Sequence, residues 1–198
     1  IRGFGRNKPL LKLAFLSGAL GIGGVPLFSG YISKTLLHES IVEYAGIAEN
    51  GGQILGTSDI RLVEWLFLIS GGLTIAYMLK LYMAVFMEEN IDRQRQKVYD
   101  DQKDSYMNKM SKTVLGICAV LFPVMGILPD RFMTWMADLG QTFMGTEETA
   151  EQIHWFSMTN LSGSLISILL GVAVYLLIVR GWMMRKQADG SKEFVNCW

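Results

Sequence analysis

Four long apolar runs, separated by charged segments, constrain the fold of this 198-residue chain more than any other feature. The first run has no charged residue over 21 positions, and a helix of that length spans roughly 32 Å, enough to cross the hydrocarbon core of a bilayer. Hydrophobic residues make up 51% of the sequence and charged residues 18%, which is typical of an integral membrane protein. We therefore predict an all-α, polytopic transmembrane helix bundle with about four spans, at residues 13–33, 62–87, 113–128 and 159–179.

Basic residues are concentrated in alternate segments between these runs. Residues 88–112 contain six Lys or Arg, whereas 45–61 and 129–158 contain a single arginine each. Because basic loops stay on the cytoplasmic side of a membrane, we predict a cytoplasmic linker at 88–112 and a cytoplasmic amino-terminal arm and carboxy-terminal tail. The 129–158 segment is then an outward loop, with an interfacial helix at 133–144 whose aromatic side chains anchor at headgroup depth.

The first run also contains residues that disrupt helices. Gly23, Gly24 and Gly30 weaken a helix, and Pro26 lacks a backbone donor and clashes with the carbonyl four residues before it. A membrane tolerates freed backbone groups only where protein or water satisfies them, as in the broken helices of transporters, where unwound backbone lines an ion path. The alternative is a proline kink whose small residues allow close helix packing. The residues alone leave both interpretations open, and the loop charges require a single crossing in either case.

Lys34 follows this stretch, and its role depends on whether the stretch is unwound. In a straight helix Lys34 extends to the outer interface, whereas after an unwound loop it lies at membrane depth, at a cost of about 2.5–3.5 kcal/mol when charged. There it can exchange protons, and His38, about 40° away around the same helix, is placed to relay them. An isolated histidine is otherwise a capping or interfacial residue. Lys80, about 12 Å from the cytoplasmic end of its helix, either extends to that interface or contributes to an intramembrane path.

The stretch GIGGVPLFSGYISK resembles the pattern G-[IL]-P-P-x-x-G-[FY]-x-x-K, with one of the two prolines missing. Two further stretches, LTIAYMLKLYMAVFMEE and NLSGSLISILLGVAVYLLIVR, match helices that come after this motif. Together they resemble the proton-conducting, antiporter-like membrane subunits of respiratory complex I, energy-converting membrane hydrogenases and Mrp-type cation/proton antiporters. The last stretch is similar to the extra carboxy-terminal helix of the subunit-5, or distal-pump, type.

The resemblance implies a first span that is broken at Pro26, and we expect the break to extend over Gly23–Gly30. It also implies that Lys34 lies on a buried polar axis near the outward half-channel, as the terminal proton-carrying lysine. The family's other pumping residues lie on earlier helices, so we expect residues 1–198 to be one membrane domain, the carboxy-terminal portion of a longer subunit. Thr35 stands where long-type members often have an acid, and Lys80 where an arginine is common.

We therefore expect a proton-translocating subunit of a multi-subunit membrane oxidoreductase, such as NADH:quinone oxidoreductase or an energy-converting hydrogenase, in a bacterial cytoplasmic (inner) membrane. Its expected partners are other membrane subunits, the lipid bilayer and protons. We expect no cofactor, metal or redox active site in this chain, so redox chemistry would belong to partner subunits. Cys118 and Cys197 are expected to be free thiols, and the formal net charge of zero gives no indication of nucleic-acid binding. The alternatives are an Mrp-type sodium/proton antiporter subunit, with Na⁺ as the coupled ion, and a non-conducting membrane scaffold.

Overall fold

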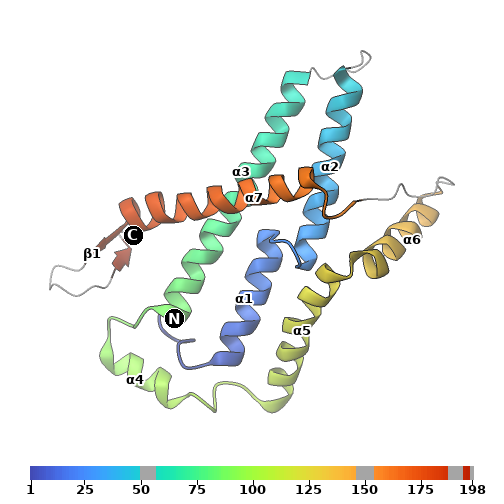
Figure 1. The fold of residues 1–198 in the computed structure, drawn as a ribbon. Helices are drawn as coiled ribbons and strands as arrows, with labels where there is room; N and C mark the ends of the chain where they lie inside the picture. The colour runs from blue at the N-terminus through green and yellow to red at the C-terminus, as the bar shows by residue number, and fades with distance from the viewer. Residues whose placement is uncertain (50–56, 146–153, 187–193, 197–198) are drawn as a thin grey trace.

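The computed structural model describes residues 1–49, 57–145, 154–186 and 194–196, and these are mostly helical. In Figure 1 the axes of α1, α2, α3 and α5 are roughly parallel or antiparallel, and α7 crosses α3 at an angle. The elements in chain order are α1 (Pro9–Gly23), α2 (Ser29–Glu49), α3 (Thr57–Tyr82), the π-helix η1 (Met83–Met87), α4 (Arg93–Asp101), α5 (Lys109–Ile127), the π-helix η2 (Asp130–Thr134), α6 (Trp135–Met144), α7 (Met158–Val174), the π-helix η3 (Tyr175–Met183), β1 (Met184–Lys186) and β2 (Phe194–Asn196).

Among the described residues, three helical segments are long and apolar enough to cross a membrane, namely Ser58–Met87, Lys109–Ile127 and Met158–Met183. They coincide with the second, third and fourth apolar runs of the sequence, which is compatible with an integral membrane protein. The first run instead divides between α1, a shorter apolar helix, and α2. The mostly helical fold agrees with the predicted fold class, and two strands of three residues, β1 and β2, pair antiparallel beside the helices. Strands of three residues are too short to show the alternating pattern by which a strand is recognised in a sequence.

α3 and α7 are held together by small residues. A Cβ atom at Gly72 would lie 2.8 Å from Leu170 Cδ2, and one at Gly171 would lie 2.6 Å from the Gly72 carbonyl oxygen. Small residues of this kind let the backbones of two apolar helices approach closely. Further along the same interface, Ala76 of α3 and Tyr175 of η3 share a buried apolar cluster. The contact therefore continues from α7 into η3 along the length of α3.

The amino-terminal arm, residues 1–8, lies against the end of α3 and against α4. The backbone N–H groups of Gly3 and Gly5 donate to the carbonyl oxygens of Ala84 and Val85 in η1, each at 2.9 Å. α4 begins immediately after Asp92, whose carboxylate accepts hydrogen bonds from the first backbone N–H groups of the helix. Such a cap satisfies donors that have no partner inside the helix. The predicted linker at 88–112 thus contains a short capped helix.

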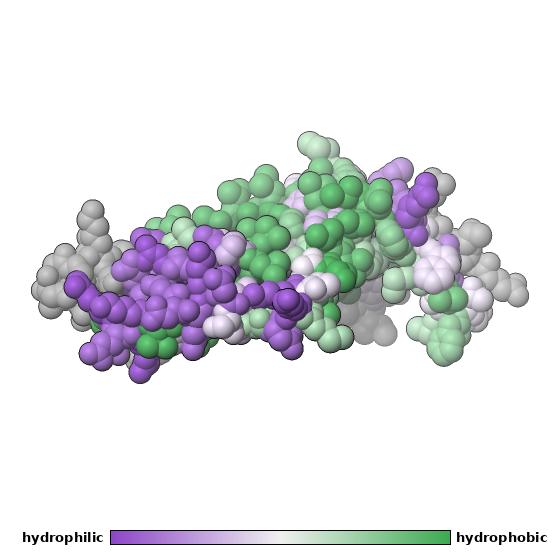
Figure 2. Space-filling model, turned by 90° about the horizontal axis from the view of Figure 1, so that it is seen from below, coloured by the Kyte–Doolittle hydropathy of each residue, from purple (hydrophilic) through white to green (hydrophobic). Residues whose placement is uncertain are grey.

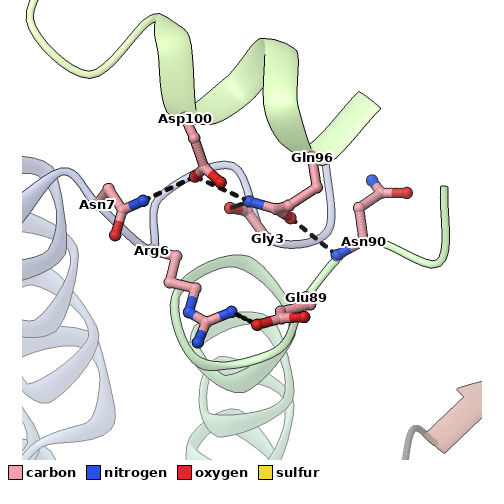
Figure 3. A network of polar contacts seen from close by, with 7 residues as sticks. All are labelled: Gly3, Arg6, Asn7, Glu89, Asn90, Gln96 and Asp100. Carbon is pink, nitrogen blue, oxygen red and sulfur yellow. Dashed lines mark hydrogen bonds and ion pairs between the residues drawn. The ribbon is translucent and has the colours of Figure 1, made fainter. Parts of the chain in front are cut away.

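Gln96 of α4 connects this helix to the arm (Figure 3). Its side-chain oxygen accepts from the Asn90 backbone N–H at 2.9 Å, and its amide nitrogen donates to Gly3 O at 3.4 Å and to Asp100 Oδ1 at 3.1 Å. Asp100 also accepts from Asn7 Nδ2 at 2.7 Å. Because Gln96 is buried, these bonds are shielded from competition with water.

Ionic groups complete the attachment of the arm. Lys8 is fully buried, and its Nζ donates to Phe4 O at 2.7 Å and to Tyr99 O at 2.9 Å. Burial lowers the pKa of Lys8, and the nearby Asp100 carboxylate acts in the opposite direction. Arg6 forms an ion pair with Glu89. Seen from this end of the molecule, hydrophilic residues gather in a patch on the side where α4 lies, beside a largely apolar surface (Figure 2). The arm and the linker therefore occupy the same end of the molecule.

Replacing Gln96 by alanine is expected to release the arm from α4. The change leaves the Asn90 N–H without its side-chain acceptor and removes one of the two donors to the buried Gly3 carbonyl, the other being the Arg6 N–H, at a cost of about 1–3 kcal/mol. Hydrogen exchange at residues 1–8 should then accelerate about tenfold or more. Gln94→Ala is the matched control, because the Gln94 side chain is exposed on the same helix. Equal exchange in the two variants would show that Gln96 does not hold the arm.

Candidate functional site

An interruption between α1 and α2 organises the candidate site. α1 ends at Gly23, and Gly24 adopts the left-handed conformation (φ 73°) of a helix C-cap, with its N–H donating back to the last turn at 2.9 Å. Pro26 follows two residues later, and proline is common at this point because it cannot continue the helix. The chain then turns through Leu27, also at positive φ (72°), and becomes helical again at Ser29. In Figure 1, α2 begins beside the end of α1 and continues in the same direction.

Two glycines make room for this turn. Gly30 places the first turn of α2 directly against α1, since a Cβ atom there would collide with the Gly21 carbonyl oxygen. Gly126 lets α5 lie directly against the turn, because a Cβ atom at Gly126 would lie 2.5 Å from the Leu27 carbonyl oxygen. The turn is therefore enclosed by α1, α2 and α5. Glycine is required at both positions by close backbone approach.

Lys34 points back to the interruption instead of extending along α2. Its Nζ donates to the Gly23 carbonyl oxygen at 3.0 Å. Its methylene groups cover Gly24, where a Cβ atom would collide with Lys34 Cδ. The side chain is half-buried, and its positive charge lies at the carboxyl end of α1, where the helix dipole is negative. Lys34 thus satisfies a carbonyl that the end of α1 leaves without an intrahelical partner.

A small cavity extends from Lys34 between α2, α3 and α7. The space available to the centres of water molecules is about 30 Å³. This is room for roughly one or two water molecules, which need polar partners to be stable there. The walls supply such partners from α2 and α7, whereas α3 contributes an aromatic and an aliphatic side chain. The lining residues are Gly23, Gly24, Tyr31, Lys34, Thr35, His38, Phe67, Leu68, Asn160, Gly163, Ser164 and Ser167.

His38 lines the same cavity and pairs with Glu64 of α3. The distance between His38 Nε2 and Glu64 Oε1 is 3.2 Å. The His38 side chain is 8% exposed and the Glu64 side chain 31% exposed. The imidazole ring stacks on Phe67, with ring centroids 6.4 Å apart, and lies against Gly163 of α7. Our sequence reasoning did not select Glu64, although an acid inside an apolar run was a signal that could have identified it.

Side-chain hydroxyl groups of α2 and α7 donate hydrogen bonds to backbone carbonyl oxygens around the cavity. Ser164 Oγ donates to the Gly24 carbonyl oxygen at 2.9 Å, and Ser167 Oγ donates to that of Leu68 at 3.1 Å. Tyr31 Oη donates to the Trp155 carbonyl oxygen at 2.7 Å. The end of α1 thus receives donors from both Lys34 and α7. Carbonyls at the end of a helix have no intrahelical partner, and these donors supply one.

The structure brings together only some of the predicted site residues. Lys34, His38, Gly23 and Gly24 line one cavity, and Lys34 also lines a second cavity between α1, α2 and α5, together with Gly30. Pro26 is in the turn and is not among the described lining residues of either cavity.

Lys80 lies on α3 away from the cavity. Nine residues, or about 13 Å along a helix, separate Lys80 from Gly71. A Cβ atom at Gly71 would lie 3.6 Å from Lys34 Nζ, so Gly71 is near the level of that amine. Lys80 is half-buried and is not among the described lining residues. A role for Lys80 in proton transfer stays a prediction.

Within the described part of the chain, no group of three or more His, Cys, Asp or Glu side chains is arranged to hold a metal ion. Cys118 is an exposed free thiol, and Cys197 lies outside the described residues. Comparisons with known proteins find no matching family model, no matching curated protein and no matching solved structure.

Proposed function

We propose that this chain is the carboxy-terminal, proton-conducting segment of an antiporter-like subunit in a multi-subunit membrane oxidoreductase. In this proposal α1 and α2 together form one broken crossing, so the chain has four spans. The observation that supports it is the position of Lys34, whose amine is bonded to Gly23 at the interruption and which lines two cavities. The motif around Lys34 supports it independently, because it resembles that of the proton-conducting family.

The chemistry of the site suits a lysine that alternates between charged and neutral forms. The charged amine is stabilised by the Gly23 carbonyl and by the carboxyl end of α1. Transfer also requires the neutral amine to form, and the two cavities that Lys34 lines are where its proton would go. A proton carrier must take both forms, whereas a permanently charged group cannot release its proton.

The remaining parts of the proposal follow from the loops and from composition. The arm and the 88–112 linker would face the cytoplasm of a bacterial cell, together with the carboxy-terminal tail. Other membrane subunits would cover the apolar helix faces that lipid does not, and would contain the electron donor and acceptor sites. Within this chain, Lys34 would pass protons outward after receiving them from residues on other segments.

Lys34→Ala tests this function in the complete complex. Inside-out vesicles are driven with NADH, or with H₂ for a hydrogenase-type complex, and proton uptake is followed by quenching of an acridine dye. We expect uptake to be abolished while the complex still assembles, because alanine cannot carry a proton. The control is Lys97→Ala, an exposed lysine on α4. Unchanged uptake in Lys34→Ala would refute the proposal.

A non-conducting scaffold is the second candidate, and one observation favours it. The bond from Lys34 Nζ to the Gly23 carbonyl is also what a static C-terminal cap of α1 would form. In that case the interruption only shapes the packing of α1, α2 and α5. The two candidates differ in whether Lys34 must change its charge, and that difference can be measured.

A further inference from the structure

We propose that His38 and Glu64 form the proton-release end of the cavity that begins at Lys34, an inference that rests on the proposed function. Lys34 and His38 both line this cavity. Glu64 is not among its described lining residues, but it contacts the imidazole from α3 at 3.2 Å. The cavity therefore lies between the Lys34 amine and the His38 imidazole, and the Glu64 carboxylate contacts the imidazole.

The exposure of the pair supports this direction of transfer. The His38 side chain is 8% exposed, whereas that of Glu64 is 31% exposed. His38 therefore lies between the cavity and a carboxylate that is more exposed than the imidazole. A proton leaving the cavity at this end would pass through the imidazole, whose two ring nitrogens can accept on one side and donate on the other.

The transfer balances without any further reactant. The protonated Lys34 amine gives a proton to water in the cavity, which passes it to His38. The imidazolium then donates the proton on Nε2 to Glu64 Oε1, and the carboxylic acid releases it to bulk water. Lys34 is left neutral and His38 neutral, and Glu64 returns to the carboxylate. The proton that Lys34 loses is the one that reaches bulk water, and no bond other than N–H and O–H changes. Lys34 takes up its next proton from residues on other segments, as the proposed function requires.

Other charged groups near His38 come from the helices that pack around it. On α2 these are Lys34 itself and Glu39, whose charge acts on Tyr31. On α3, Arg61 is about one turn from Glu64 and has contacts of its own. The described lining from α7 consists of Asn160, Gly163, Ser164 and Ser167, none of which titrates. Glu64 is thus the acid in direct contact with the imidazole.

The variant Glu64→Gln distinguishes proton transfer from a purely structural role of the His38–Glu64 pair. Glutamine keeps the size of the side chain and can hydrogen-bond His38, so a contact that only ties α2 to α3 would survive. Glutamine cannot take up and release a proton, so proton release would be blocked. We expect proton uptake by vesicles with the complete complex to fall about tenfold or more, since positioned acid–base groups contribute at least that much.

Two further variants complete the test. Glu64→Asp keeps the carboxylate and should retain several times the uptake of Glu64→Gln. Glu43→Gln, at an exposed acid on α2, should leave uptake unchanged. Native gels confirm that each complex assembles.

The outcomes separate this inference from the proposed function. Normal uptake in Glu64→Gln together with lost uptake in Lys34→Ala would overturn the release pair and leave Lys34 as the carrier. Normal uptake in both variants would overturn the proposed function as well. Loss of assembly in Glu64→Gln but not in Glu64→Asp would also overturn the inference, because the carboxylate would then be needed for folding.

Discussion

Gly30→Ala is expected to lower the stability of the protein sharply and to reduce the amount that accumulates in the membrane. The added methyl group would collide with the Gly21 carbonyl oxygen, which belongs to the backbone of a helix and cannot rotate away. The collision is relieved only if α2 moves away from α1. Overpacking of this kind costs about 1–3 kcal/mol, and a clash with backbone belongs at the upper end. The thermal unfolding midpoint of the purified protein in detergent measures the effect.

Gly18→Ala is the matched control for this substitution. Gly18 also lies in the apolar first run, but no described atom outside its own helix lies within 4 Å of a Cβ atom placed there. Alanine is also a better helix former than glycine by about 0.8–1.0 kcal/mol. We therefore expect Gly18→Ala to leave the unfolding midpoint unchanged or slightly raised. Similar midpoints for Gly18→Ala and Gly30→Ala would show that α1 and α2 do not meet closely at Gly30.

The positions of the long helices could be predicted from the sequence, because they depend on the residues within each apolar run. Long runs of apolar residues form helices because all backbone groups must be paired away from water, and three such runs are helices of spanning length. The interruption is also local, since Gly24 and Pro26 act on their own backbone. The residues alone left two interpretations of the glycine-rich stretch open, a kinked helix and an unwound one. In the structure, α1 ends at Gly23 and α2 begins at Ser29.

The contacts of the site depend on distant segments and could not be predicted in this way. Glu64 meets His38 because α2 and α3 pack with a particular register, and no spacing within either helix determines that register. Ser164 reaches Gly24 across 140 positions of the chain. The direction of the Lys34 side chain likewise depends on where α1 ends relative to α2. For the same reason the sequence did not predict that the arm would bind Gln96.

Lys34→Arg is expected to abolish proton uptake while leaving the protein folded. Arginine keeps the positive charge and can donate to the Gly23 carbonyl, so it can replace lysine as a cap at the carboxyl end of α1. Its guanidinium is not deprotonated in proteins, so it cannot release a proton to the cavity. Lys34→Met has the opposite properties, because it removes the charge and the donor and should lower the unfolding midpoint as well as uptake.

The most direct test of Lys34 as a proton carrier is therefore proton uptake by inside-out vesicles that contain the complete complex with Lys34→Arg. Lys97→Arg on the exposed face of α4 is the control, and native gels establish equal assembly. We predict assembled Lys34→Arg complex with proton uptake at the level of vesicles without electron donor, and normal uptake in the control. Normal uptake by the Lys34→Arg complex would contradict the account, because a fixed charge at this position would then be sufficient and Lys34 would be only a cap of α1.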